Sequence, residues 1–276
     1  MTKIIEVKGL TKQFKQTKAV KGIDFHVKKG SLFAFLGTNG AGKSTTIEIL
    51  CTIQEKTSGY VMIDGHVLGS AKANGAIRNV IGVVFQQSVL DDALTVRENI
   101  WHRGKLYHLT KQQLTENYRF VSKALQLTDI ENRKYGQLSG GQKRRADIAR
   151  AIIHRPKILF LDEPTTGLDP KTRQLVWSVI EQLRSTTEMT IFLTTHYMEE
   201  AVRADDIVIL KEGEIIAQGA PHILKELYAK DQLILFMKND SEDRLKSLQL
   251  PYEKRGEALV IPVQSTLDSI PILEVL

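Results

Sequence analysis

Residues 32–45, LFAFLGTNGAGKST, are the most informative stretch of this chain about its architecture. The first five are an uninterrupted apolar run, as expected of a strand that is buried on both faces. Residues 37–45 match the phosphate-loop pattern G-x-x-x-x-G-K-[ST], and the helical pattern TTIEILCTI overlaps the end of the loop. In this strand–loop–helix context, glycines let backbone N–H groups wrap phosphates closely, while Lys43 reaches the β- and γ-phosphates and Ser44 ligates Mg²⁺. The segment therefore predicts a nucleotide-binding α/β domain.

Similar apolar runs recur along the chain, separated by helical patterns, and predict a parallel sheet. They lie at residues 80–85, 158–162, 190–196 and 206–210. Alternating segments predict a small N-terminal antiparallel sheet, at residues 4–10, 19–27 and 59–68. From about residue 88 to 153 helix formers replace the strands, which predicts a helical subdomain inserted into a P-loop NTPase (RecA-like) sheet.

The pattern changes again after the Gly-Ala-Pro sequence at 219–221, where we expect a domain boundary. Residues 1–221 form the predicted nucleotide-binding domain, and residues 222–276 a small C-terminal α/β appendage. In the appendage the strand-like QLILFM and ALVIPV flank a short helical candidate, SEDRLKSL, at 241–248. The sequence leaves three alternatives for the role of this appendage: regulation, locking of a dimer and contact with a partner.

Composition describes an ordinary folded protein of the cytosol. The chain has 276 residues, 42% hydrophobic and 25% charged, and its longest apolar runs fall far short of a membrane span. No signal-like sequence precedes MTKIIEVKGL, and the single cysteine, Cys51, reads as a small apolar filler. The net charge of +6 is spread along the chain, which favours a solvated surface over nucleic acid or an anionic membrane as its partner.

Ionisable residues stand at the ends of two predicted strands. Asp162 and Glu163 close ILFLDEP, and His196 closes TIFLTTH. Ligands bind at the carboxyl ends of strands in open α/β sheets. There the aspartate would hold Mg²⁺, the glutamate would orient or deprotonate the attacking water, and the histidine would contact the γ-phosphate. The alternatives are a pair of acids that start a helix and a structural histidine.

Two further candidates carry weaker signals. Gln86 follows the strand at the junction with the helical insertion, where a glutamine would ligate Mg²⁺ or water while sensing the insertion's position. Phe14 lies in a lysine-rich turn and would stack on a base, although a core position is the default for an isolated phenylalanine.

Taken with the segment LSGGQ at 138–142 and GLDP at 167–170, these motifs resemble the ATP-binding subunits of ABC transporters. The resemblance covers about residues 3–220. LDEPTTGLDP and TTHYMEEA look most like subunits of daunorubicin-resistance-type drug exporters, whose C-terminal extension is also similar in length and position. One departure is Thr38, where the family usually has proline; we expect a change in loop stiffness at most.

The resemblance implies a role for each matching residue. Glu163 would be the catalytic glutamate, His196 the switch histidine and Gln86 the Q-loop glutamine. The implied metal ligands are Ser44, Gln86 and Asp162. The implied nucleotide contacts are Phe14, Gly37, Asn39, Gly40, Gly42, Lys43, Ser44, Thr45, Ser139, Gly140, Gly141 and Asp169.

The resemblance also implies a head-to-tail dimer, with an identical or a different ATP-binding subunit. Each ATP would lie between one subunit's phosphate loop and the other's Ser139, Gly140 and Gly141, whose helix start offers N–H groups to the γ-phosphate. The following residues, KRRADIARAII, predict an amphipathic helix with Ile148 and Ile152 inward and with Lys143, Arg144 and Arg150 outward.

The function implied is an ATPase that uses ATP and Mg²⁺ to drive export of a drug-like or lipidic substrate through a separate transmembrane permease. The permease's cytoplasmic helices would dock near residues 86–99, which places this chain on the inner face of the cell membrane. An importer subunit and a soluble ABC ATPase acting on DNA or ribosomes are the alternatives. The chain has no sustained heptads or second ATPase domain, so no nucleic-acid partner is expected.

Overall fold

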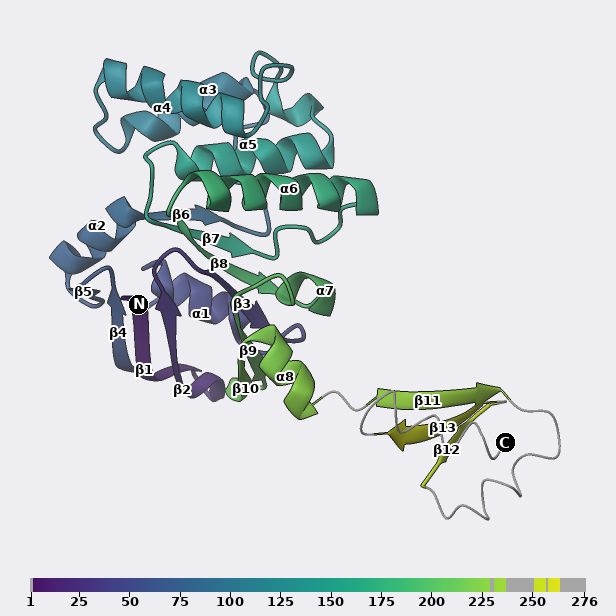
Figure 1. The fold of residues 1–276 in the computed structure, drawn as a ribbon. Helices are drawn as coiled ribbons and strands as arrows, with labels where there is room; N and C mark the ends of the chain where they lie inside the picture. The colour runs from purple at the N-terminus through teal and green to yellow at the C-terminus, as the bar shows by residue number, and fades with distance from the viewer. Residues whose placement is uncertain (1, 229–230, 237–250, 257, 264–276) are drawn as a thin grey trace. The chain divides into compact units, whose positions relative to one another are not determined.

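The computed structural model describes residues 2–228, 231–236, 251–256 and 258–263 (Figure 1). The chain divides into two compact units, residues 1–221 and 222–276. Within the described residues, no helix is both long and apolar enough to cross a bilayer.

The first unit is built on a six-stranded sheet of order β10-β9-β3-β8-β7-β6 (Figure 1). Its strands are β3 (Leu32–Leu36), β6 (Ile81–Val84), β7 (Ile158–Asp162), β8 (Thr190–Thr195), β9 (Asp206–Lys211) and β10 (Glu214–Gly219). All neighbours are parallel except β10, which pairs antiparallel with β9. The predicted parallel sheet is confirmed. The edge strand β10 had no apolar run to reveal it, because its side chains are alternately exposed and half-buried.

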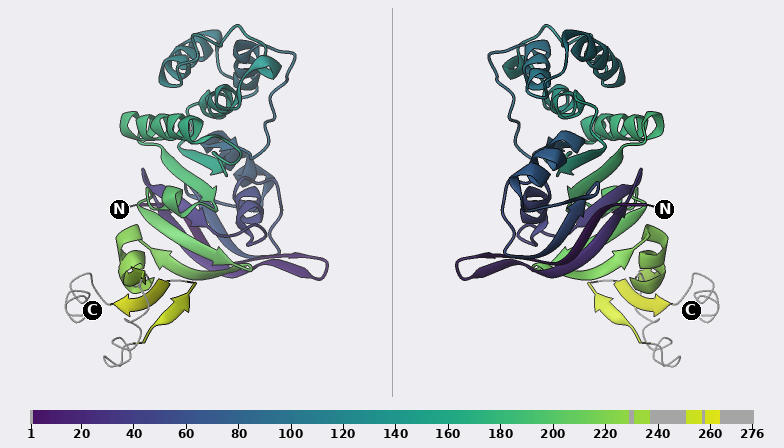
Figure 2. Two further views of the ribbon diagram at one scale, coloured as in Figure 1. Left: turned by 90° about the vertical axis from the view of Figure 1, so that its right-hand side faces the viewer. Right: turned by 90° about the vertical axis from the view of Figure 1, so that its left-hand side faces the viewer.

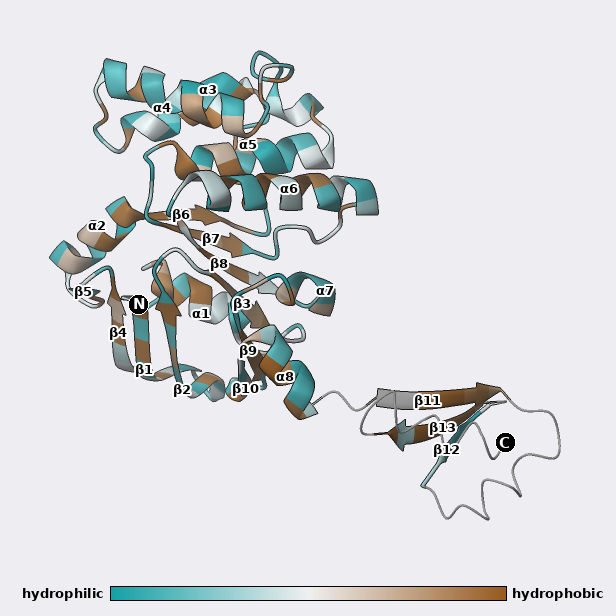
Figure 3. Ribbon diagram, in the orientation of Figure 1, coloured by the Kyte–Doolittle hydropathy of each residue, from teal (hydrophilic) through white to brown (hydrophobic). Residues whose placement is uncertain are grey.

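The predicted N-terminal antiparallel sheet is confirmed, with the order β2-β1-β4-β5. Its strands are β1 (Lys3–Phe14), β2 (Thr17–Lys28), β4 (Ser58–Ile63) and β5 (His66–Val67). The expected single strand at 59–68 is two strands, because Asp64 and Gly65 both adopt positive φ angles and turn the chain. One buried cluster joins apolar side chains of this sheet, of helix α1 (Lys43–Leu50) and of the six-stranded sheet. Figure 3 shows β6 and β7 as largely hydrophobic, whereas hydrophobic and hydrophilic residues are mixed along β1 and β2.

The segment between β6 and β7 is helical, as predicted. It contains α3 (Val96–Lys105), α4 (Lys111–Ala124), the 3-10 turn η1 (Tyr135–Gln137) and α5 (Gly140–Ile152). Figures 1 and 2 show α5 beside α6 (Pro170–Thr186) on one side of the sheet, with α3 and α4 farther out. The remaining helices of this unit are α2 (Ala71–Val80) and α7 (Met198–Ala201), and α8 (Pro221–Tyr228) begins at the unit boundary.

The second unit contains a three-stranded antiparallel sheet of order β11-β13-β12. The strands are β11 (Asp231–Phe236), β12 (Glu253–Arg255) and β13 (Ala258–Val263), and they include both predicted strands. Leu259 and Ile261 centre its apolar cluster. The helical candidate at 241–248 lies outside the described residues.

Burial keeps His154 neutral beside the helical segment. Its Nε2 lies 3.0 Å from the carbonyl oxygen of Ile81, and its ring stacks on Tyr107 with centroids 3.7 Å apart. Burial lowers the pKa of His154 from 6.5 to about 4. A proton on Nδ1 would find no acceptor in the described part of the chain, which explains why the charged ring is disfavoured.

We expect His154 to make the fold acid-sensitive. Its folded-state pKa lies below the unfolded value, so the unfolded chain binds the proton first as the pH falls, and stability is lost between about pH 6.5 and 4. Between about pH 7 and pH 4.5, wild type should lose about 2 kcal/mol more unfolding free energy than His154→Gln. Urea unfolding followed by circular dichroism measures both values, and equal losses would contradict the assignment.

Candidate active site

The phosphate loop is shaped by close backbone approaches at two glycines. A Cβ atom on Gly37 would lie 2.5 Å from the carbonyl oxygen of Leu210, and one on Gly42 would lie 2.6 Å from that of Ala19. Gly42 also has a φ of 100° at the position directly before α1. Side chains are therefore excluded at both positions, and the loop carries backbone groups where β3 passes into α1.

Lys43 is the first residue of α1, and it is almost fully buried against this loop. Its Nζ donates hydrogen bonds to the carbonyl oxygens of Gly37, at 2.8 Å, and Thr38, at 3.0 Å. Nζ also lies 3.3 Å from Oε1 of Glu163, on a different strand end. The ammonium group thus sits between the loop backbone and a carboxylate, where its three N–H groups have acceptors.

A pocket of about 290 Å³ lies over the loop, and it brings together residues that are far apart in the sequence. It is lined by Ala19, Asn39, Gly40, Gly42, Lys43, Ser44, Thr45, Gln86 and Glu163. The phosphate loop, the end of β6 and the end of β7 therefore meet at one site. Ala19 was not anticipated from the sequence, because an alanine on a neighbouring sheet carries no motif.

Ser44 and Asp162 lie next to each other, as a magnesium site needs. Ser44 Oγ donates to Asp162 Oδ1 at 3.4 Å, and Thr194 Oγ1 donates to the same oxygen at 2.6 Å. Hydroxyl and carboxylate oxygens are ligands that Mg²⁺ prefers, so these residues fit the ion. Among the described residues no cluster of three or more His, Cys, Asp or Glu side chains forms a metal site, so an ion here would depend on further oxygens, such as phosphate.

Glu163 has a strained backbone that is held from several sides. Its φ is 44°, in the left-handed region that a glutamate rarely adopts. Its N–H group donates to the carbonyl oxygen of Thr194 at 3.2 Å and to Thr194 Oγ1 at 3.0 Å. Strain of this kind persists only where surrounding contacts hold it, and it is found most often at functional sites.

The carboxylate of Glu163 is surrounded by polar groups from other elements. Its Oε2 accepts from Thr166 Oγ1 at 3.1 Å and from Gln86 Nε2 at 3.5 Å. His196 Nδ1 lies 3.5 Å from the same oxygen without a hydrogen bond, and its ring lies at a tilt of 40° to that of Tyr197, with the centroids 4.0 Å apart. The structure therefore brings Gln86, Glu163 and His196 together, as the strand-end pattern predicted.

Ser139, Gly140 and Gly141 do not line this pocket. Ser139 caps α5 in a capping box with Gln142. The backbone N–H group of each residue donates a hydrogen bond to the side-chain oxygen of the other. Gly140 and Gly141 are the first two residues of α5, so their N–H groups make no hydrogen bond within the helix. A Cβ on Gly141 would lie 2.5 Å from Thr172, so packing within this chain also requires glycine there.

Phe14 and Asp169 also lie outside the pocket lining, as do Gly37, Asp162 and His196. Phe14 ends β1 with 42% of its surface exposed, and Lys12 Nζ lies 4.6 Å above its ring. Asp169 caps α6 by accepting from the N–H group of Thr172, and hydrogen bonds with Thr172 lower the pKa of this carboxyl. Both roles in nucleotide binding stay predictions.

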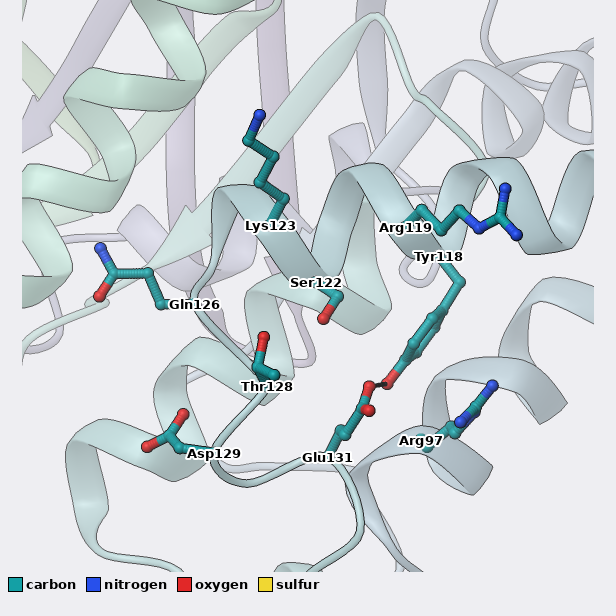
Figure 4. Close-up of a pocket in the computed structure, with 9 residues that line it drawn as sticks. All are labelled: Arg97, Tyr118, Arg119, Ser122, Lys123, Gln126, Thr128, Asp129 and Glu131. Carbon is teal, nitrogen blue, oxygen red and sulfur yellow. Dashed lines mark hydrogen bonds between the residues drawn. The ribbon is translucent and has the colours of Figure 1, made fainter.

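A second, more open depression lies in the helical segment, away from these residues (Figure 4). Its volume is about 570 Å³, and Tyr118 donates to Glu131 across it at 2.8 Å. The charged residues of its wall have both signs: Arg97, Arg119, Lys123, Asp129 and Glu131. None of the predicted site residues borders it.

The outward placement predicted for two arginines of α5 is wrong. Arg144 is 6% exposed and Arg150 is 8% exposed. Arg150 Nη2 donates to the carbonyl oxygen of Val83 at 2.6 Å, on the edge strand β6. Helix α5 packs against β6 and against α3, α4 and α6, a long-range arrangement that helical periodicity does not reveal.

The family model described as ABC transporter matches residues 20–166, more than half of the chain. The chain belongs to the ABC transporter family. It is an ATP-binding subunit of this family and an ATPase, which is what the resemblance in its motifs implied.

Several ABC relatives are similar over most of their length. The Nod factor export ATP-binding protein I of Rhizobium sp. (strain N33) is 38% identical, with 93% of this chain and 84% of the relative covered. The daunorubicin/doxorubicin resistance ATP-binding protein DrrA of Streptomyces peucetius is 37% identical, with 90% and 74% covered. The linearmycin resistance ATP-binding protein LnrL of Bacillus subtilis (strain 168) is also 37% identical, with 84% and 74% covered.

Solved ABC structures share the fold. The cbiO1 protein of Clostridium perfringens, part of the ABC transporter complex cbiONQ, superimposes with a TM-score of 0.76 and 29% identity, covering 90% of this chain and 96% of that one. A dimeric ATP-binding cassette in a post-hydrolysis state, bound to ADP and Pi, gives 0.71 and 29%, covering 79% and 98%.

Two threonines of the ABC site were missed from the sequence. Thr194 contacts both Asp162 and Glu163, and Thr166 contacts the Glu163 carboxylate. A threonine in a strand that is buried on both faces was the available signal for Thr194, because a buried hydroxyl needs a partner. Thr166 carried no comparable signal, since its contact depends on how the turn after β7 folds.

Proposed function

We propose that this chain powers export of a drug-like or lipidic substrate through a separate transmembrane permease, as one half of a head-to-tail dimer of ATP-binding subunits. The observation that carries the proposal is the pocket in which Lys43, Gln86 and Glu163 face the phosphate loop. The names of the relatives support export, because they describe Nod factor export and resistance to linearmycin and daunorubicin.

In this proposal the phosphate loop binds ATP and Glu163 activates water. Lys43 would exchange its loop carbonyl oxygens for β- and γ-phosphate oxygens, which the buried amine reaches without leaving the loop. Water attacks the γ-phosphorus, its proton passes to a Glu163 carboxylate oxygen, and the bond to the bridging β–γ oxygen breaks as ADP leaves. Mg²⁺ held by Ser44 and Asp162, with Gln86 near it, would neutralise charge on the phosphates.

His196 would contact the γ-phosphate. Its Nδ1 has no hydrogen-bond partner in the described residues, although the ring lies beside Glu163. A ring nitrogen in this position is able to donate to a phosphate oxygen without breaking an existing bond. The contact with the Tyr197 ring restricts the imidazole and supports this role.

The dimer completes the site with a helix start from the other subunit. Ser139, Gly140 and Gly141 lie outside the pocket of their own chain, and the N–H groups of the two glycines, in the first turn of α5, make no hydrogen bond within the helix. A helix start of this kind favours an anion. Phe14 would stack on adenine and Asp169 would approach the partner, so that ATP joins the two subunits and hydrolysis releases them.

Purification from detergent-solubilised membranes tests the export proposal. We expect the chain, at the inner face of the cell membrane, to co-purify with a multispanning protein and without an external binding protein. The complex should hydrolyse ATP in a Mg²⁺-dependent way. An associated external substrate-binding protein would indicate an importer, and co-purification with ribosomes or DNA in place of a membrane protein would contradict a transport role.

A further inference from the structure

The Arg144 guanidinium binds the backbone of two turns that border the nucleotide site. Nε donates to the carbonyl oxygen of Pro164 and Nη1 to that of Phe85, each at 2.7 Å. Nη2 donates to the carbonyl oxygens of Asp162 and Glu163, each at 3.2 Å. One side chain of α5 therefore holds the ends of β6 and β7 together.

The carbonyl groups bound by Arg144 belong to the residues that position the catalytic groups. Phe85 directly precedes Gln86, and the other three carbonyl groups surround Glu163 in the chain. Glu163 is the residue with the strained φ of 44°. Because Arg144 holds the carbonyl groups of three successive residues there, it fixes the peptide planes that set this φ.

Only an arginine suits this position. The guanidinium is a planar group with N–H donors on three nitrogens in fixed directions, whereas the ammonium of a lysine is a compact charge whose donors all lie on one nitrogen. Arg144 is 6% exposed, and burial lowers its pKa, as expected of a cation removed from water. The four hydrogen bonds offset that cost, since a buried charge without partners strongly destabilises a fold.

Helix α5, which carries Arg144, begins at the LSGGQ motif and is anchored to the Gln86 segment at a second point. Ser88 Oγ donates to Asp147 Oδ1 at 2.6 Å, and the Tyr135 hydroxyl donates to the same carboxylate at 3.3 Å. A displacement of the helix start would therefore reach Gln86 and Glu163 through Arg144 and Asp147 together. Movement within a buried network of this kind is costly in free energy, because each broken hydrogen bond leaves a desolvated polar group without a partner.

We propose that Arg144 is a positioning residue that couples the LSGGQ helix to the hydrolytic centre of its own chain. In the dimer proposed above, on which this inference rests, that helix touches the ATP of the other site. Arg144 would then make Glu163 and Gln86 of one site responsive to nucleotide at the other.

Paired substitutions of adjacent arginines test this inference. Arg144→Lys keeps the positive charge but loses the planar set of N–H donors. We expect kcat to fall by about 10- to 100-fold, as for a catalytic group misplaced by about 1 Å. KM for ATP should stay within about threefold and the Hill coefficient should approach 1, because binding is kept while coupling is lost. Steady-state ATP hydrolysis measures all three.

Arg145→Lys is the matched control. Arg145 also donates to carbonyl oxygens, those of Leu125 and Gln126, but these lie in the helical segment away from the pocket. We expect its kcat and Hill coefficient to stay close to wild type. Equal kcat losses in the two variants, or a wild-type kcat and Hill coefficient in Arg144→Lys, would overturn the inference. So would a parallel loss of ATP affinity and thermal stability, which indicates a structural role alone.

Chemical rescue keeps the inference testable if the lysine variant folds poorly. Arg144→Gly should regain part of its kcat in millimolar methylguanidinium, whereas Glu163→Gln should not. Absence of rescue in a folded, ATP-binding Arg144→Gly variant would count against the inference. Failure of wild type itself to dimerise with ATP would instead contradict the proposed function, so the two failures are distinguishable.

Discussion

Glu163→Gln is expected to reduce ATP turnover by about 10²- to 10⁴-fold, the usual contribution of a general base. The amide has nearly the shape of the carboxylate, and its oxygen is still able to accept from Thr166 or Gln86. It does not take a proton from water at neutral pH. The contact of the carboxylate with Lys43 is weakened, but the phosphate loop that binds ATP is unchanged.

ATP binding and ATP-dependent dimerisation should therefore survive in Glu163→Gln. Phosphate release measures turnover, and size-exclusion chromatography with ATP measures pairing. Glu199→Gln is the matched control, because Glu199 is a nearby exposed carboxylate that pairs with Arg173 and does not face the pocket. If Glu163→Gln released phosphate at the wild-type rate, Glu163 would not be the general base.

Mixing Lys43→Ala chains with Ser139→Arg chains is expected to restore ATP-dependent pairing that neither variant shows alone. Lys43→Ala removes the phosphate-binding amine, and Ser139→Arg places a bulky side chain at the helix start and removes the cap of α5. In a head-to-tail heterodimer both lesions fall in one composite site. The other site combines an intact phosphate loop with an intact helix start.

The outcome of mixing separates a shared site from a self-contained one. Chromatography with ATP should show dimers in the mixture and monomers in each variant alone. Because neither variant pairs with itself, the dimers in the mixture should be heterodimers of one chain of each variant. Loss of all ATP-dependent pairing in the mixture would contradict the shared site. ATP-dependent dimers of Ser139→Arg alone would show that Ser139 does not contribute to that site.

The main features of the site follow from local sequence. The phosphate loop is recognisable because its glycines, Lys43 and Ser44 lie close together in the sequence. The apolar run that precedes the loop predicts a buried parallel strand. Asp162 and His196 were placed at the same sheet edge because both follow such runs. Parallel strands end at a common edge, so their positions in the sequence imply their proximity.

The conformation of Glu163 was beyond sequence reasoning. Its left-handed φ depends on Thr194 from a neighbouring strand and on Arg144 from a helix that precedes it in the chain. The buried positions of Arg144 and Arg150 were likewise not predicted, because a helical pattern specifies one apolar face and says little about what covers the opposite face.

The phosphate loop, the parallel sheet and the chemical groups at the strand ends were predictable, because they depend on short-range periodicity and on residue types with few alternative roles. How those groups are held follows from the packing of the folded chain. The backbone of Glu163, the threonines around it and the buried Arg144 depend on hydrogen bonds between segments far apart in the chain. Such contacts form only when the helices between β6 and β7 pack against the sheet.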